Sequence, residues 1–282
     1  MPPRSYPTAR QRRLGAELRK LRERAGMSGA TAAAFLGGER AQISHIESGR
    51  YGVSAERVRR LAAHYSATDR HLVDALAQMA EERTKGWWEA YRGVLSPGFP
   101  DLAELEHHAT GVRQIQMLHI PGLLQTREYA RELILGGVAG LPEAELAPRV
   151  EFRISRRGIF DRPVPTRYEA LVHEAALRMR YCSDEVMRGQ LEFLHEVSHW
   201  PSVTVRVIPF GARITGSVHS MMYASAGIPP LDTVQLDSAF GSGFLDAEPQ
   251  LARYRVLLES AGAAALDPDE SRTALRRISR ER

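Results

Sequence analysis

Four side chains able to hydrogen-bond to nucleic-acid bases lie close together in residues 39–48, whose sequence is ERAQISHIES. They are Arg40, Gln42, Ser44 and His45. An arginine guanidinium can bind O6 and N7 of guanine through two hydrogen bonds, and the shorter polar side chains can reach base edges or phosphates. If residues 39–48 are helical, the pattern indicates a helix that contacts DNA in the major groove. The alternative is an exposed helix whose polar side chains only face solvent.

The flanking sequence predicts helices that would position this segment. Apolar residues recur at helical spacing before and within it, and Gly37 and Gly38 interrupt the pattern just ahead of it. Glycine tolerates positive φ, so the pair allows a sharp turn between two helices. Residues 14–50 are therefore predicted to form a helix-turn-helix. The residues of the apolar pattern are Leu14, Leu18, Leu21, Ala33, Leu36, Ile43 and Ile46.

This stretch resembles the XRE-type, or phage-repressor-like, helix-turn-helix family. The matching residues are Leu14, Gly15, Leu18, Arg19, Leu21, Arg22, Gly26, Ser28, Ala33, Leu36, Gly37, Ile43, Ser44, Ile46, Glu47 and Gly49. The resemblance implies a structural salt bridge between Arg22 and Glu47. It also implies a DNA-binding role for Ser28, which caps the second helix near a phosphate, and for Gln42, which lies near the backbone. The positions at which the family contacts bases are Arg40, Ala41, Ser44 and His45.

One position departs from the family pattern. The family often has glutamine just after the cap of the second helix, where it contacts a phosphate, and this chain has Gly29. We therefore expect phosphate contacts to shift toward Arg50 and Arg57.

The distribution of charge agrees with binding to a polyanion. Residues 1–70 include 14 basic and 6 acidic residues, a net charge of +8, whereas the remaining 212 residues have a net charge of −4. A basic N-terminal third is typical of phosphate binding. Cys182 is the single cysteine, which excludes an internal disulfide. We find no signal peptide and no apolar run long enough to span a membrane, and we expect a cytoplasmic protein.

The pattern along the chain predicts four segments. We expect a flexible basic arm over residues 1–12, a helix-turn-helix domain of about five helices over 13–78, a linker helix over 79–98, and a regulatory, partner-binding or dimerisation domain over 99–282. The fold class is thus an N-terminal all-α helix-turn-helix bundle followed by an α+β domain.

Within the second domain, the period of the apolar pattern changes from helical to alternating. Helices are expected over about 101–117, from Thr126 onward, over 142–157, over 174–179, from Ser183 to about His199, over 248–261, and after Asp267 and Pro268. Strands are expected over 167–172, 203–208, 221–224 and 233–236.

The second domain also resembles a known family. Its landmarks, which begin in the linker, are Trp87-Trp88, Leu105-Glu106, residues 121–126 (PGLLQT) with Tyr129-Ala130, residues 173–177 (HEAAL), Gln190-Leu191, residues 205–210 (VRVIPF) and residues 269–271 (DES). They resemble the C-terminal domain, of unknown function, of WhiJ-like actinobacterial regulators. The resemblance implies a small BldB-like partner protein, in an arrangement like a toxin–antitoxin pair, and a role in development or antibiotic production.

Residues 195–199 match the zinc-protease motif H-E-x-x-H, with His195, Glu196 and His199. In a helix this spacing places two imidazoles on one side, with the glutamate as general base. The site would need a third ligand, and Trp200-Pro201 ends the helix immediately. A zinc hydrolase is therefore only a remote alternative. We expect no catalytic residues, no metal, no cofactor and no enzymatic activity.

Together these patterns predict a sequence-specific DNA-binding transcriptional regulator, in its simplest form a repressor. Its partners would be double-stranded DNA, a second copy of the chain in a homodimer, and the BldB-like protein or an effector. The alternative is an antitoxin-like interaction protein that neutralises a neighbouring gene product and autoregulates its operon.

Overall fold

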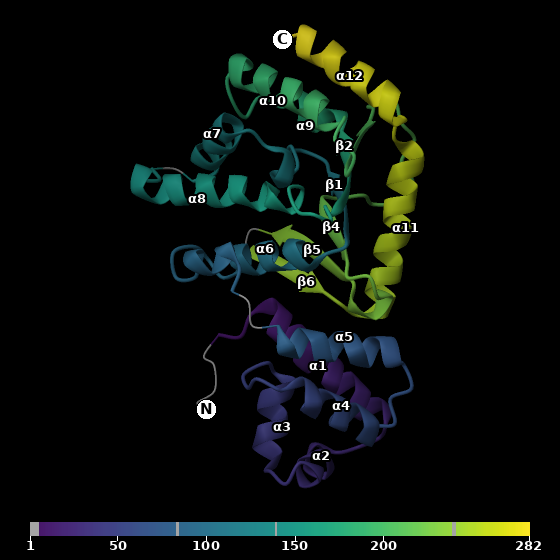
Figure 1. The fold of residues 1–282 in the computed structure, drawn as a ribbon. Helices are drawn as coiled ribbons and strands as arrows, with labels where there is room; N and C mark the ends of the chain where they lie inside the picture. Colours follow the sequence, from purple (N-terminus) through teal and green to yellow (C-terminus); the bar gives the residue numbers. More distant parts are fainter. Residues whose placement is uncertain (1–5, 83–84, 139, 239–240) are drawn as a thin grey trace. The chain divides into compact units, whose positions relative to one another are not determined.

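The computed structural model describes residues 6–82, 85–138, 140–238 and 241–282, which form two compact units, Met1–Glu89 and Ala90–Arg282. The described part of the first unit is helical (Figure 1). Its side chains with the predicted apolar spacing, such as Leu18, Ile43 and Ile46, are 1–2% exposed and form its core. Its helices are α1 (Ala9–Arg24), α2 (Gly29–Phe35), α3 (Arg40–Glu47), α4 (Ala55–His64) and α5 (Arg70–Glu81).

The first helix begins earlier than predicted, so the arm expected over residues 1–12 is wrong at its C-terminal end. Thr8 forms a capping box: its hydroxyl accepts from the Gln11 amide, and the Gln11 side chain accepts from the Thr8 amide. Two otherwise unpaired amide groups are satisfied in this way, which stabilises a helical start at Ala9. Residues 1–5 of the expected arm lie outside the described residues.

The linker helix expected over 79–98 is also wrong. Helix α5 ends at Glu81, and Glu82 has an extended backbone with ψ of 109°. A short 3₁₀ helix, η1 (Trp87–Tyr91), follows, and the next α-helix begins at Gly98. Residues 83–84 are outside the described part. Gly86 and Pro97 interrupt the segment that was predicted to be one helix.

Within the described residues of the second unit, six strands form one mixed sheet in the order β3-β2-β1-β4-β5-β6. Strands β3, β2 and β1 are parallel, and β4, β5 and β6 continue the sheet in antiparallel fashion. The strands are β1 (Gly111–Gln116), β2 (Arg167–His173), β3 (Val203–Ile208), β4 (Met221–Ser225), β5 (Thr233–Ser238) and β6 (Gly241–Leu245). The predicted α+β fold class is confirmed.

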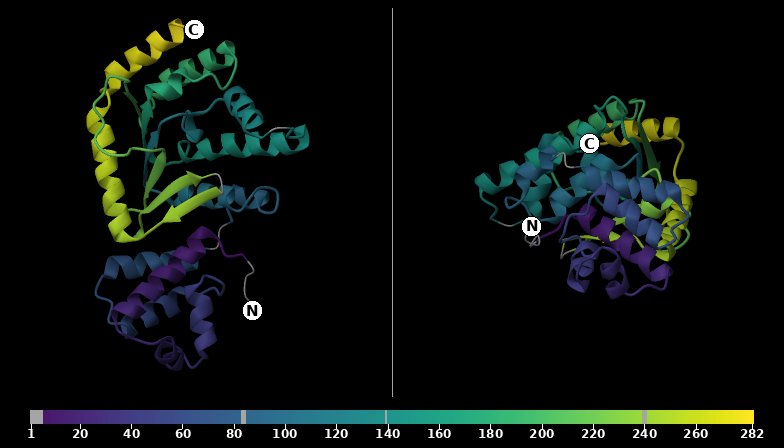
Figure 2. Two further views of the ribbon diagram at one scale, coloured as in Figure 1. Left: turned by 180° about the vertical axis from the view of Figure 1, so that it is seen from behind. Right: turned by 60° about the horizontal axis from the view of Figure 1, so that its bottom comes forward.

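Helices cover both faces of the sheet (Figures 1 and 2). One face packs against α11 through a core that includes Ile115, Leu171 and Leu258. The other face is covered by most of the remaining helices through a larger core that includes Val112, Leu194 and Leu275. The helices are α6 (Gly98–His108), α7 (Arg127–Gly137), α8 (Glu143–Ser155), α9 (Glu174–Arg178), α10 (Asp184–Val197), α11 (Glu248–Ala264) and α12 (Pro268–Arg280), with short 3₁₀ helices η2 (Gly122–Leu124), η3 (Arg156–Ile159) and η4 (Pro229–Leu231).

The helix expected over about 101–117 is wrong beyond His108, because its last part is strand β1. Residues 111–116 (GVRQIQ) alternate between the two faces of the sheet, but polar side chains hide the alternation. Gln114 is 7% exposed, and its amide oxygen accepts a 2.6 Å hydrogen bond from the Tyr168 hydroxyl on β2. A buried glutamine satisfied in this way takes the place of an apolar residue.

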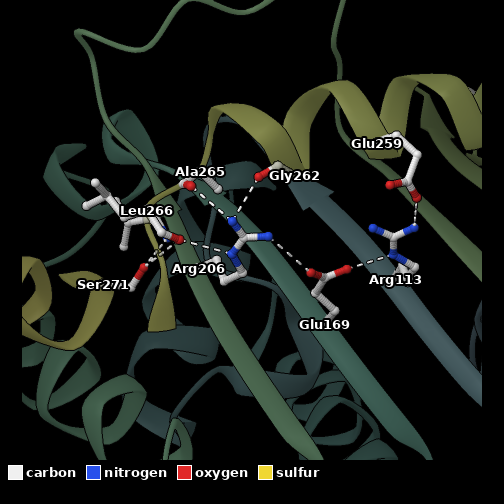
Figure 3. A network of polar contacts seen from close by, with 9 residues as sticks. Arg113, Glu169, Arg206, Glu259, Gly262, Ala265, Leu266 and Ser271 are labelled. Atoms are coloured by element: carbon white, nitrogen blue, oxygen red, sulfur yellow. Dashed lines mark hydrogen bonds and ion pairs between the residues drawn. The ribbon is translucent and has the colours of Figure 1, made fainter. Parts of the chain in front are cut away.

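An arginine on β3 stabilises the C-terminal end of α11 (Figure 3). Arg206 donates to the carbonyl oxygens of Gly262 at 2.8 Å, Ala265 at 3.0 Å and Leu266 at 3.0 Å. The last carbonyls of a helix have no partner within it, and a cation there also interacts favourably with the helix dipole. Glu169 joins Arg206 to Arg113, with ion-pair distances of 3.6 and 2.6 Å.

The 121–126 stretch (PGLLQT) is a buried loop whose backbone is satisfied by glutamine side chains. Gln190, which is fully buried on α10, accepts from the Thr126 amide at 2.7 Å and donates to the Leu124 carbonyl at 2.8 Å. Gln125 donates to the Ile120 carbonyl at 2.8 Å. Buried backbone groups need partners, and these contacts give a physical reason for the sequence landmarks at 121–126 and 190.

Candidate nucleic-acid interface

Two glycines allow α1 to lie directly against the C-terminal end of α3. A Cβ atom on Gly15 would lie 2.5 Å from the carbonyl oxygens of Ile46 and Glu47, and one on Gly49 would lie 2.8 Å from the backbone of Gln11. Gly49 also has a φ of +76°, a conformation that favours glycine. The close approach fixes the position of α3 on α1.

An ion pair between α1 and α3 reinforces this contact. Arg22 Nε and Nη2 donate to the two carboxylate oxygens of Glu47 at 2.6 and 2.9 Å, and Arg22 Nη1 donates to the Met27 carbonyl at 2.7 Å. The side chains are only 12% and 11% exposed. The hydrogen bonds that Arg22 donates to Glu47 raise the pKa of Arg22. Burial, with the nearby Glu47 charge, raises the pKa of Tyr65 to about 12. These groups orient α3 and leave its other side free.

The exposed side of α3 carries residues that the sequence predicted to contact DNA bases. Arg40, Ala41 and Ser44 are exposed, whereas Ile43 and Ile46 on the opposite side are 2% exposed. The structure therefore brings three of the four expected base-contacting positions together on one accessible surface.

Gln42 and His45, the other two residues of α3 expected to contact DNA, are half-buried, and each contacts a neighbouring turn. The His45 ring lies 4.8 Å from the Tyr51 ring, between centroids. The Gln42 side chain folds back over Gly38, where its amide oxygen lies 2.1 Å from the place that a Cβ would take. Tyr51 was not selected from the sequence, because nothing in the spacing indicates its contact with His45.

Ser28 and Arg40 lie near each other at the start of α2. The Ser28 hydroxyl caps α2 by accepting from the Thr31 amide at 3.1 Å. A Cβ on Gly29 would lie 3.8 Å from Cγ of Arg40, so the Arg40 stem passes beside the position where the XRE-type family often has glutamine.

The arginines that follow α3 differ in their surroundings. Within the described part of the chain, neither Arg50 nor Arg57 has a carboxylate within ion-pair distance; Arg50 is exposed and Arg57 is half-buried. Arg59 lies 3.7 Å from Asp74, and the guanidinium of Arg60 lies 5.7 Å from the Phe35 ring centroid. Arg50 and Arg57 are therefore the cations best able to contact phosphates.

The H-E-x-x-H residues do not have the geometry of a rigid helical zinc site. Helix α10 ends at Val197, so His199 lies beyond it, and the His195 and His199 ring centroids are 5.0 Å apart. Burial, followed by the nearby Arg276, lowers the pKa of His195. Among the residues described, no group of three or more histidine, cysteine or acidic side chains is arranged to hold a metal ion.

Comparison with known families agrees with this division of the chain. Residues 13–76 match a family described as a helix-turn-helix domain. Residues 99–277 match a family described as a domain of unknown function (DUF5753), and this match covers more than half of the chain. The chain belongs to the DUF5753 family. No curated protein matches it, and no solved structure does.

The DUF5753 match covers the sheet and its helices up to α12, and the helix-turn-helix match covers α2 and α3 together with the helices that hold them. The N-terminal unit is therefore a helix-turn-helix domain of the XRE type, the kind of unit by which regulators bind DNA. None of the helices in the described ranges combines the length and apolar composition that crossing a bilayer requires.

Proposed function

We propose that this DUF5753 protein is a sequence-specific transcriptional regulator of the WhiJ-like type, that it acts as a repressor in the cytoplasm, and that it has no enzymatic activity. The observation that supports the proposal is the surface of α3, where Arg40, Ala41 and Ser44 are exposed while the Arg22–Glu47 pair fixes the helix from behind. An arginine so placed can read guanine.

The regulator is proposed to bind as a homodimer. Helix α3 has eight residues and covers too few base pairs to select one site in a genome. Two copies related by a two-fold axis would read half-sites about one helical turn apart, roughly 34 Å. The bound site is then expected to be palindromic.

Recovery of sheared genomic DNA on the purified full chain, followed by sequencing, tests the proposal. The wild type is expected to enrich a small set of palindromic sites. Protein with Arg40→Ala and His45→Ala should lose them, whereas Arg59→Ala, at an exposed arginine of α4 that faces Asp74, should keep them. The same yield of sites from the α3 variant and the wild type would contradict the proposal.

For the second unit we propose a small BldB-like partner protein, on the strength of the landmarks shared with WhiJ-like regulators. Titration of that partner into a complex of the regulator with its operator is expected to change the operator affinity. An unchanged affinity would refute this part. If the product of the neighbouring gene proved toxic when expressed alone, an antitoxin-like role with autoregulation of the operon would replace this proposal.

A further inference from the structure

A group of buried charges in the second unit lies beside the 121–126 loop. Arg156 donates from Nε and Nη2 to the two oxygens of Glu106 at 2.7 and 2.5 Å, and both side chains are at most 6% exposed. The charges of this pair compensate each other, as buried ions require. Nη1 of Arg156 donates no hydrogen bond to the described residues.

The neighbouring Arg153 has no such compensation. It donates a 2.8 Å hydrogen bond to the neutral amide oxygen of Gln125, and among the described residues no carboxylate lies within ion-pair distance of it. Burial, and after it the Arg156 charge, lowers the pKa of Arg153 to about 10. A half-buried cation with only a neutral partner destabilises a fold unless something else binds it.

Two nearby titratable groups do not supply the missing charge. Asp237 acts on Arg153 only from beyond ion-pair distance, and its Oδ1 already accepts hydrogen bonds from Gln235 at 2.7 Å and Ser242 at 3.1 Å. Burial, and next the Arg153 charge, lowers the pKa of His119, which keeps that imidazole neutral near pH 7. Arg153 is therefore left without a close counter-ion.

Because residue 122 is glycine, both guanidinium groups can lie close to the backbone of the loop. A Cβ on Gly122 would lie 3.0 Å from Nη1 of Arg156 and 3.5 Å from Nη1 of Arg153. Nη1 of Arg156, which donates no hydrogen bond to the described residues, and Nη1 of Arg153, which donates to Gln125, thus lie beside the same point of the PGLLQT backbone. Two convergent guanidinium groups suit a carboxylate or a phosphate, which can accept several charge-assisted hydrogen bonds at once.

We propose that Arg153 and Arg156, beside Gly122, bind the anionic group of a small-molecule ligand, a carboxylate or a phosphate. The ligand would be the effector of the regulator proposed above, and only that role rests on the proposed function. The anion-binding site itself lies within the second unit. The site lies next to the 121–126 loop, whose backbone is hydrogen-bonded to the Gln190 side chain of α10. The ligand would therefore contact a buried structural loop.

The test is thermal unfolding of the full chain in titrations of inorganic phosphate and, separately, succinate, with ionic strength held constant by sodium chloride. At least one anion is expected to raise the Tm along a saturable curve, by about 3 °C at ten times its Kd. The two titrations distinguish a phosphate ligand from a carboxylate ligand.

Three variants locate the response. Arg153→Met is expected to unfold at a higher Tm than the wild type without anion, because an uncompensated cation is removed, and to show no saturable shift. Arg131→Gln, at an exposed arginine of α7, and Arg40→Ala, on the DNA-binding surface, should respond as the wild type does. The Arg40 variant separates this site from anion binding to α3.

Three results would overturn the proposal. They are the absence of a saturable shift in the wild type with either anion, an equal shift in Arg153→Met, and a shift that Arg40→Ala abolishes. If Arg153→Met does not fold, Arg153→Gln serves in its place, because its neutral amide cannot compensate an anion. Loss of DNA binding in any variant leaves this test unaffected.

Discussion

Replacing Glu47 with glutamine is expected to loosen α3 from α1. The carboxylate accepts two hydrogen bonds from Arg22, and both side chains are nearly nine-tenths buried. Removing one partner of a fully buried pair costs about 3–5 kcal/mol, and an exposed pair contributes about 0.2–1 kcal/mol. For the intermediate burial of this pair, we expect Glu47→Gln to lower the free energy of local unfolding by about 2 kcal/mol.

Native-state hydrogen exchange measures this loss where it occurs. A cost of about 2 kcal/mol corresponds to roughly 30-fold faster exchange of the α3 amides, including those of Ile43 and Ile46. Asp74→Asn is the matched control, because Asp74 of α5 pairs with Arg59 of α4 at 3.7 Å, where the side chains are 72% and 51% exposed. Its effect should be less than twofold on α3.

Equal exchange in Glu47→Gln and the wild type would refute the argument that this pair holds α3. So would acceleration spread evenly over all helices of the first unit, because that result would indicate global destabilisation. DNA binding should weaken together with exchange protection, although Glu47 itself faces away from the exposed surface of α3.

Three further predictions concern stability, pH and affinity. Gln190→Met keeps the volume of the side chain but leaves two buried backbone groups of the 121–126 loop unpaired, so a loss of about 2–4 kcal/mol is expected in denaturant unfolding; a loss below about 0.5 kcal/mol would contradict it. The pKa of Tyr65 is raised to about 12 in the folded chain, so its contribution to stability is fully present below pH about 10 and is lost as the pH rises toward 12. Tyr65→Phe should therefore flatten the curve of unfolding free energy against pH between pH 10 and 12. An unchanged curve would exclude Tyr65 as the cause. Gly29→Gln restores a residue common in the XRE-type family at a place without steric conflict, and operator affinity measured by fluorescence anisotropy should rise roughly fivefold, whereas no gain would show that Arg40 already fills that role.

Local signals made much of the fold predictable. Serine, threonine and aspartate caps such as Ser28, Thr126 and Asp267 accept hydrogen bonds from the first turns of their helices, as their sequence positions predicted. The alternating apolar pattern of residues 203–208, VTVRVI, likewise predicted strand β3. These features depend on a few neighbouring residues, and their physics is complete within one turn or one strand.

Features that depend on pairing between distant segments could not be predicted in this way. Strand β1 contains an arginine and two glutamines, and its assignment requires Tyr168 and Glu169 of β2 as partners. The missing counter-ion of Arg153 is equally invisible in sequence, because it follows from how Glu106 pairs with Arg156 across 50 residues. The assignment of β1 and the missing counter-ion of Arg153 therefore both depend on contacts between segments that are distant in the sequence.

The same contrast holds for the DNA-binding surface. The positions on α3 followed from their spacing and from the resemblance to XRE-type domains, and the structure places Arg40, Ala41 and Ser44 on one exposed side. The half-burial of His45 against Tyr51 and of Gln42 over Gly38 depends on turns whose side-chain packing has no sequence pattern.

The most direct test of the central claim is the affinity of wild type, Arg40→Ala and Arg59→Ala for a recovered operator and for random DNA at one salt concentration. If α3 reads bases, Arg40→Ala should weaken operator binding by roughly 5- to 150-fold, corresponding to about 1–3 kcal/mol, and weaken random DNA much less. Arg59→Ala should change both affinities little. Equal losses on operator and random DNA in Arg40→Ala would contradict sequence reading by α3.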